Sequence, residues 1–135
     1  MKKEFEKKFF GREMEYMDLF EEGDIDGALK MIQETWDIFS EPKIDQDLFY
    51  ILIEDLIKIC TKSGRYELGN QYISLLFVSG MKRADYGEKE LVAGILAYEQ
   101  GKLEIAKEMF YIANYKSDGE LFRNKENKKY KELIK

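Results

Sequence analysis

Carboxylates are the most numerous side chains in this 135-residue sequence that could act as acids or bases. The sequence contains 27 Asp and Glu residues and no histidine. Histidine is the commonest general base and a common metal ligand at neutral pH. Its absence excludes ordinary zinc sites, serine triads and cysteine–histidine pairs. Carboxylate pairs remain as acid–base groups, but on so charged a chain most are expected on solvated surfaces. We therefore predict a protein that is not an enzyme, with no catalytic residues, no cofactor and no metal ion.

Cys60 is the only cysteine, so an internal disulfide cannot form. It ends the apolar run LIKIC, where a small buried hydrophobic side chain is the favoured interpretation. The alternative is a reactive thiol, which would need a cationic neighbour to favour the thiolate.

The start of the chain, MKKEFEKKFFGREMEYMDLF, is interrupted by acids and lacks the apolar centre of a signal peptide. No segment reaches the roughly 18 uninterrupted apolar residues of a membrane-spanning helix. We expect a cytoplasmic protein that does not bind a membrane.

Composition favours helix, since Glu, Lys, Leu and Ile dominate and Pro42 is the single proline. We predict one all-α domain over residues 1–135. Its helices are expected near 3–21, 25–38, 45–62, 66–79, 86–100 and 103–115, with a short amphipathic one near 125–134. They form three hairpins, over 3–38, 45–79 and 86–115, followed by a C-terminal helix. The helix containing DLFYILIEDLIKIC is apolar on nearly every side and should be the most buried.

The segment AYEQGKLEIAKEMFYIA, residues 97–113, has apolar residues at helical spacing on both sides of Gly101. Two helices joined by a tight turn account for this spacing, with Gly101 in the left-handed conformation. Ala106 and Ala113 are small enough for close helix packing, and Phe110 fills the remaining space.

This segment resembles the second half of a tetratricopeptide repeat. The same frame can be placed on Gly23 and, with Gly69 at the alanine position, on Gly64. The resemblance implies a short right-handed α-solenoid of about three hairpins with a concave groove. The family's groove positions, carried onto this sequence, are Phe10, Glu13, Met17, Phe20, Glu21, Ile51, Glu54, Lys58, Lys62, Glu88, Leu91, Ile95 and Tyr98.

Charge is distributed unevenly along the chain. Residues 13–55 contain fourteen acids against two lysines, which indicates either a solvated acidic surface or a surface that attracts a basic partner. The tail, RNKENKKYKELIK, has six basic and two acidic residues. We expect Tyr130, Leu133 and Ile134 to pack on the last hairpin, and we do not expect nucleic acid to bind.

A second resemblance covers most of the chain. The segments Gly23 to Leu29, Trp36 to Lys43, Gly101 to Phe110, Ser117 to Phe122 and Lys129-Tyr130 are similar to small bacterial tetratricopeptide proteins of the immunity class. This implies stoichiometric inhibition of a basic toxin domain, for example a nuclease. The expected partner-binding residues are Glu13, Met17, Phe20, Glu21, Glu22, Asp24, Asp26, Glu54, Asp55 and Tyr98.

Two other functions remain open. A general peptide-binding adaptor or assembly scaffold would use the same groove. A structural module would form a homodimer through the exposed apolar ends of the repeats.

Overall fold

The computed structural model describes residues 2–80 and 82–135, which form only helices, turns and loops. The chain is therefore all-α, as predicted. The α-helices are α1 (Lys2–Glu21), α2 (Ile25–Trp36), α3 (Asp47–Lys62), α4 (Tyr66–Gln71), α5 (Ile73–Val78), α6 (Glu88–Glu99), α7 (Leu103–Ser117) and α8 (Lys128–Lys131). Short 3-10 helices cover Lys43–Asp45, Glu120–Phe122, Lys125–Asn127 and Glu132–Ile134.

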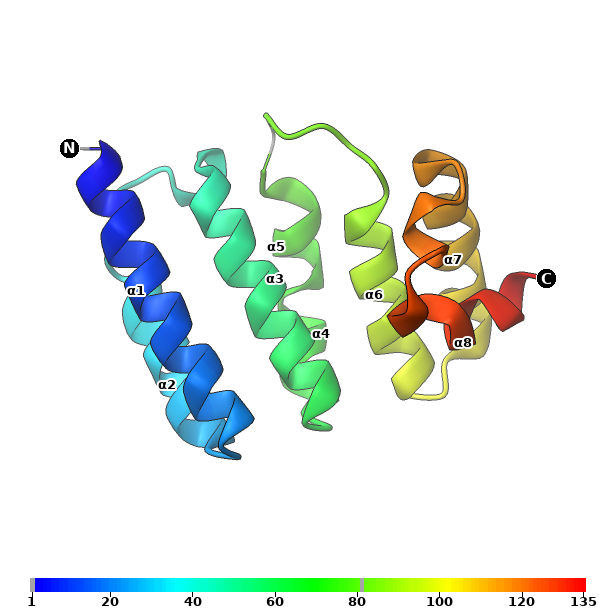
Figure 1. Ribbon diagram of the computed structural model, residues 1–135, viewed down its shortest axis with the longest axis horizontal. Helices are drawn as coiled ribbons and strands as arrows, with labels where there is room; N and C mark the ends of the chain where they lie inside the picture. Colours follow the sequence, from blue (N-terminus) through cyan, green and yellow to red (C-terminus); the bar gives the residue numbers. More distant parts are fainter. Residues whose placement is uncertain (1, 81) are drawn as a thin grey trace.

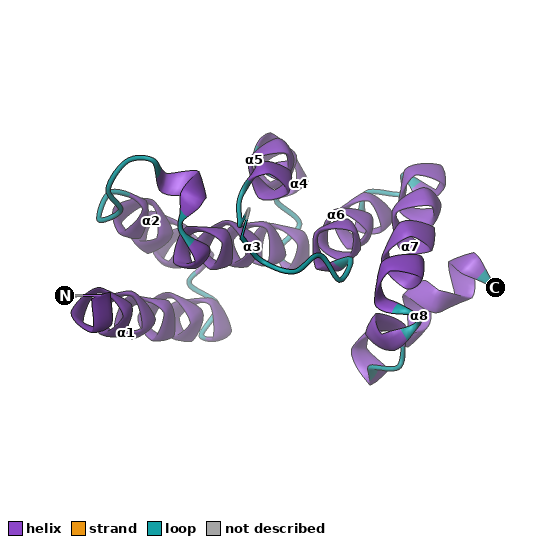
Figure 2. Cartoon of the chain, turned by 90° about the horizontal axis from the view of Figure 1, so that it is seen from above, coloured by secondary structure: helices purple, strands orange, loops and turns teal. Residues whose placement is uncertain are grey.

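The helices pair in chain order as three hairpins. α1 packs on α2, α3 packs on α4 and α5, and α6 packs on α7. The first helices of the hairpins lie in one row, in which α3 contacts both α1 and α6 (Figure 1). Seen from above, α2, α4 and α5 lie on one side of this row, and the C-terminal segment lies beside α7 at the far end (Figure 2).

The same turn closes each hairpin. Gly23, Gly64 and Gly101 all have positive φ, at 92°, 76° and 80°, a conformation that costs glycine little. The residue after each glycine donates its backbone N–H to a carbonyl oxygen five residues earlier, in the pairs Asp24–Leu19 (2.8 Å), Arg65–Cys60 (2.8 Å) and Lys102–Ala97 (2.9 Å). Each first helix therefore ends with a Schellman-type turn.

Small residues let the two helices of a hairpin approach closely. Five residues after each turn glycine stand Ala28, Gly69 and Ala106, and all three are buried. In the third hairpin Gly94 of α6 faces Phe110 of α7, and a Cβ atom at Gly94 would lie only 2.6 Å from the ring. The spacing of residues 97–113 thus corresponds to tight packing around a buried phenylalanine.

α3 is the central helix. It contacts α1, α2, α4, α5 and α6 and has more buried residues than any other helix, as its apolar sequence predicted. Cys60 is fully buried, and this burial raises the pKa of its thiol to about 11. The residue packs as a hydrophobic side chain, and the prediction of a buried cysteine is confirmed.

Polar side chains link one hairpin to the next. Arg65 Nη1, after the second turn, lies 2.6 Å from Asp26 Oδ1 of α2. Between the second and third hairpins, Asn70 and Gln100 exchange two side-chain hydrogen bonds of 2.9 Å each. Both links therefore join neighbouring hairpins through side chains.

The single helix predicted over 66–79 is wrong, because it is broken at Tyr72. The backbone N–H of Tyr72 bonds to the carbonyl of Gly69, three residues back, at 3.1 Å. Glycine and the aromatic and β-branched pair Tyr72-Ile73 all lower helix propensity at this point. The Tyr72 ring packs against Trp36 of the first hairpin, with centroids 5.8 Å apart.

The C-terminal helix predicted over 125–134 is also wrong as one α-helix. Two 3-10 turns flank the four-residue α8 instead. Tyr130, Leu133 and Ile134 nevertheless pack against the third hairpin, together with Phe122, and the predicted intramolecular packing of the tail is confirmed.

Candidate functional site

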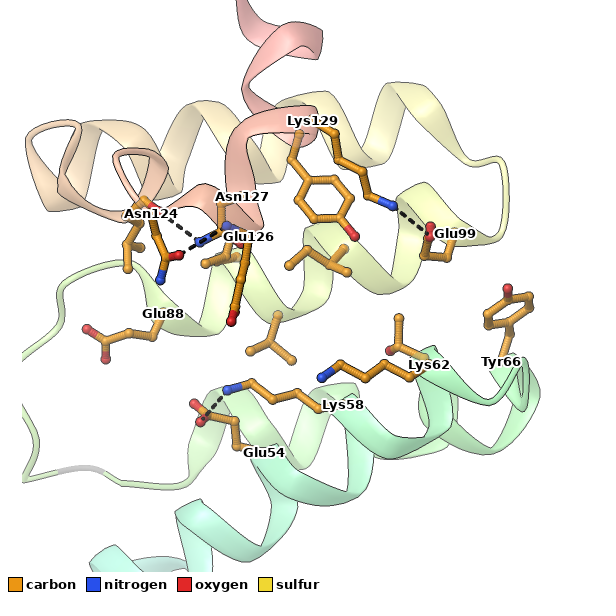
Figure 3. Close-up of a pocket in the computed structure, with 16 residues that line it drawn as sticks. Glu54, Lys58, Lys62, Tyr66, Glu88, Glu99, Asn124, Glu126, Asn127 and Lys129 are labelled. Carbon is orange, nitrogen blue, oxygen red and sulfur yellow. Dashed lines mark hydrogen bonds and ion pairs between the residues drawn. The ribbon is translucent and has the colours of Figure 1, made fainter. Parts of the chain in front are cut away.

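A cavity of about 640 Å³ lies between α3, α6 and the C-terminal segment (Figure 3). Its lining from α3 and α4 is Glu54, Lys58, Thr61, Lys62 and Tyr66, and from α6 it is Glu88, Leu91, Val92, Ile95 and Glu99. The C-terminal segment contributes Leu121, Asn124, Glu126, Asn127, Lys129 and Tyr130. Parts of the chain more than seventy residues apart therefore share one concave site.

Six of the groove positions predicted from the family frame line this cavity. They are Glu54, Lys58, Lys62, Glu88, Leu91 and Ile95. They come together because α3 and α6, each the first helix of a hairpin, lie side by side. The groove positions on α1 do not reach the cavity, because α3 separates α1 from α6 (Figure 1).

The cavity combines an apolar floor with charged edges. Leu91, Val92 and Ile95 of α6 form the floor. Lys58 and Lys62 extend toward the cavity from α3, while Glu126 extends into it from the opposite side (Figure 3). An apolar floor with polar groups around it can hold a side chain of a bound peptide and orient its neighbours.

Ion pairs within the protein occupy part of these edges. Lys58 Nζ lies 3.0 Å from Glu54 Oε1, and Lys129 Nζ lies 3.5 Å from Glu99 Oε1. Glu54 also accepts a 2.8 Å hydrogen bond from the hydroxyl of Tyr50. Its charge is therefore largely used inside the fold.

The wall made by the C-terminal segment was not among the predicted site residues. Asn127 holds this wall in place, since its Nδ2 donates a 2.8 Å hydrogen bond to the carbonyl of Leu121. Asn124 accepts a 3.0 Å bond from the backbone N–H of Glu126 and caps the 3-10 turn. The apolar spacing of Tyr130, Leu133 and Ile134 was the one signal that this segment returns to the last hairpin.

The turn between α1 and α2 forms the acidic end of the molecule, which we define as Glu21, Glu22, Asp24 and Asp26. All four residues are exposed. Asp24 is the N-cap of α2, and its Oδ1 accepts a 2.9 Å bond from the backbone N–H of Gly27. Asp26 pairs with Arg65. Of the four acids, Asp24 therefore caps a helix and Asp26 forms an ion pair, whereas Glu21 and Glu22 do neither.

Glu13 and Asp55 meet between α1 and α3. The hydroxyl of the fully buried Tyr16 donates a 2.6 Å hydrogen bond to Asp55 Oδ2. Burial, reinforced by the adjacent carboxyl group of Glu13, raises the pKa of Asp55 to about 8, and the opposing effect of the Tyr16 bond is smaller. Asp55 therefore holds its proton more tightly than an exposed aspartate does and adds less to the acidic surface.

The predicted apolar contact residues are partly covered. Met17 and Phe20 of α1 are half-buried and pack against the main core. Tyr98 of α6 is half-buried, and its ring meets that of Tyr130 edge-on with centroids 5.0 Å apart. Each of these three side chains keeps an exposed part that a partner could contact.

Across residues 2–80 and 82–135, no three Asp, Glu or Cys side chains converge in a way that could hold a metal ion. No helix in the described part of the chain combines the length and apolarity needed to cross a membrane. Comparison of the chain with protein-family models, with curated proteins and with solved structures finds no match.

Proposed function

We propose that this protein is an immunity protein that neutralises a bacterial toxin by stoichiometric binding through its acidic end. The observation that carries the proposal is the run of seven acids from Glu13 to Asp26, which contains no Lys or Arg. Glu21 and Glu22 of this run are exposed at the α1–α2 turn. A toxin that acts on nucleic acid needs a basic surface to attract phosphate, and clustered acids would attract and cover such a surface.

We also infer that the three hairpins form a short right-handed α-solenoid of the tetratricopeptide type. The support is the repetition of one turn geometry at Gly23, Gly64 and Gly101. A small buried residue follows each turn at the same distance, and the first helices contact one another in order. Repeats of this kind present a continuous face to protein partners.

The predicted contact residues take different roles in this proposal. Glu21 and Glu22 steer the partner, because their charges are not neutralised inside the fold. Asp24 and Asp26 add charge, but Asp24 also caps α2 and Asp26 also pairs with Arg65. Glu13, Glu54 and Asp55 lie farther along the row of α1 and α3, where Asp55 bonds to Tyr16 and Glu54 bonds to Tyr50 and pairs with Lys58. The exposed parts of Met17, Phe20 and Tyr98 supply apolar contact.

A growth experiment tests this function. The tagged protein is used to capture partners from the bacterium that encodes it, and each captured protein is expressed alone in a laboratory host. An immunity function predicts that one basic captured protein stops growth and that co-expression of this chain restores it. If no captured protein is toxic, or if co-expression gives no protection, the proposal is wrong.

The second candidate is a peptide-binding adaptor, and the cavity between α3 and α6 favours it. Its apolar floor and charged edges suit one side chain of an extended or helical segment. An adaptor would bind several weakly held peptides, and substitution in the cavity, for example Ile95→Glu, would abolish their binding. An immunity protein that uses the acidic end would keep its partner after the same substitution.

A further inference from the structure

The outer face of α7 differs from the outer faces of the other two hairpins. On α2 the exposed residues are Asp26, Lys30, Gln33 and Glu34, and on α4 and α5 they are Glu67, Gln71, Ser74 and Val78. On α7 the charged Glu104, Lys107 and Glu108 are exposed together with five large apolar or aromatic side chains, namely Leu103 (49%), Ile105 (54%), Tyr111 (44%), Ile112 (40%) and Tyr115 (86%). Only the third hairpin therefore presents an apolar and aromatic outer surface along the described chain.

The fold does not use this face. The opposite side of α7 carries Ala106, Phe110 and Ala113, which are fully buried against α6 and the C-terminal segment. The C-terminal segment also packs on that inner side, so it leaves the outer face open. Exposed aromatic and branched apolar residues gathered on one helix face are typical of an interaction surface.

Two glutamates and two tyrosines of this face are arranged symmetrically, and the exposed Lys107 lies beside them, with its Nζ 5.9 Å from the centroid of the Tyr111 ring. Glu104 and Glu108, both exposed, stand four residues apart in the first half of α7. Tyr111 and Tyr115 stand four residues apart in the second half. The glutamate pair and the tyrosine pair lie at equal distances in sequence on either side of the midpoint between Met109 and Phe110. Along the helix, the face therefore presents two carboxylate acceptors followed by two hydroxyl donors at the same spacing.

A face with this symmetry is complementary to itself when two copies meet antiparallel about a two-fold axis. Glu104 then lies opposite Tyr115 of the partner subunit, and Glu108 lies opposite Tyr111 of the partner subunit. In this arrangement each tyrosine hydroxyl can donate a hydrogen bond to a glutamate carboxylate of the other copy. An apolar partner face or a basic segment would not provide matching groups for both the glutamates and the tyrosines. Ile105 and Ile112 lie beside these pairs and lose solvent contact.

We propose that the outer face of α7 is a homodimer interface in which α7 packs antiparallel on α7 of a second copy of this chain. The fifteen residues of α7 are about 22 Å long at a rise of about 1.5 Å per residue. A single helix face of this length gives a small interface, so the dimer forms reversibly as protein concentration rises. The acidic end and the α3–α6 cavity stay free in both copies.

Sedimentation equilibrium of the full chain over a wide concentration range tests the interface. The monomer mass is 16.0 kDa, and the proposal predicts a mass that rises toward twice this value with concentration. The double substitution Ile105→Glu, Ile112→Glu removes the rise. The matched control is Val78→Glu, Tyr86→Glu, which places the same charges on apolar residues exposed elsewhere (51% and 61%) and leaves the rise intact. Circular dichroism checks that each variant is folded.

A second variant tests the antiparallel pairing itself. Tyr111→Lys, Tyr115→Lys places cations opposite the two glutamates of the partner subunit, so the dimer persists at low salt and dissociates as salt rises. Loss of the dimer at low salt in this variant overturns the pairing. A wild-type mass that stays at the monomer value at every concentration, or a dimer that survives the two isoleucine substitutions, overturns the interface.

Discussion

Tyr16 of α1 donates its hydroxyl to Asp55 of α3 across a distance of 2.6 Å, and this bond joins the first hairpin to the second. Tyr16 is fully buried, and burial together with the nearby Asp55 raises the pKa of its hydroxyl. Glu13 and Glu54 are the other ionisable groups that face Asp55, and both oppose its ionisation. A protonated Asp55 relieves this repulsion, so the contact between α1 and α3 depends on pH.

The pKa of Asp55 predicts how stability changes with pH. Its folded-state pKa is about 8, whereas the ordinary value is 3.8. Between these values the folded protein binds more protons than the unfolded chain, so the free energy of unfolding falls as pH rises. The stabilisation is complete below about pH 4 and is lost as pH passes through about 8. We expect a loss of at least ~1 kcal/mol across this window.

Asp55→Asn tests this dependence, because the amide mimics the protonated carboxyl and still accepts the Tyr16 bond. Urea unfolding is measured at several pH values between about 5 and about 9. The variant should show a flatter stability profile than the wild type and be the more stable of the two at the alkaline end. The control Asp18→Asn changes an exposed acid of α1 and should keep the wild-type profile. Parallel profiles for wild type and Asp55→Asn would rule out this role for Asp55.

Gly94→Ala tests the close packing of α6 on α7. The added Cβ would lie 2.6 Å from the Phe110 ring, so the ring or the helix must shift, at a cost of about 1–3 kcal/mol. Gly11→Ala is the matched control in α1, since a Cβ there meets nothing within 4 Å. This control should stabilise the protein by about 0.5–1 kcal/mol through helix propensity. Thermal unfolding that shows equal effects for both substitutions would contradict the packing account.

Tyr130→Ala tests the attachment of the C-terminal segment. The Tyr130 side chain is 7% exposed, and its ring centroid lies 5.0 Å from that of Tyr98 and 5.4 Å from that of Phe110. Removing it should lower the free energy of unfolding by about 3 kcal/mol. Hydrogen exchange of residues 120–134 should accelerate in parallel. Lys128→Ala, at an exposed position of α8, should change neither quantity; if the two variants behave alike, the segment is not held by Tyr130.

The hairpins could be predicted because their signals are local. Gly101, the small residue at 106 and the aromatic residue at 110 lie within one turn and the helix that follows it. The same pattern predicted the turns at Gly23 and Gly64. The break at Tyr72 was missed because it accompanies packing against Trp36, which lies 36 residues earlier and comes close only in the folded chain.

The cavity was only partly predictable for a related reason. Glu54, Lys58, Leu91 and Ile95 were placed on one face because each lies on the first helix of a hairpin. Asn124 and Glu126 were missed, since the path of the C-terminal segment is set by the bond of Asn127 to the Leu121 carbonyl and by burial of Tyr130. The sequence predicted that Tyr130, Leu133 and Ile134 pack on the last hairpin, but it did not predict that the residues before them form a wall of the cavity.

The charge of Asp55 could not be judged from the sequence. It was counted with the acids of residues 13–55, yet its partner Tyr16 lies 39 residues away. Asp26 was counted in the same way, although it forms an ion pair with Arg65 of the next hairpin. Local sequence therefore indicated where acids are concentrated, and the fold decides which of them keep a free charge.

The affinity of this protein for the proposed toxin partner as a function of salt tests the central claim most directly. The captured domain is titrated by calorimetry with three proteins: the wild type, the double variant Glu21→Lys, Glu22→Lys, and the control double variant Glu120→Lys, Glu132→Lys. The control makes the same charge change at exposed positions of the C-terminal segment. We predict that the acidic-end variant binds at least about tenfold more weakly at low salt and shows a smaller salt dependence, while the control matches the wild type. Equal affinity and equal salt dependence for all three proteins would contradict the claim that the acidic end binds a basic partner.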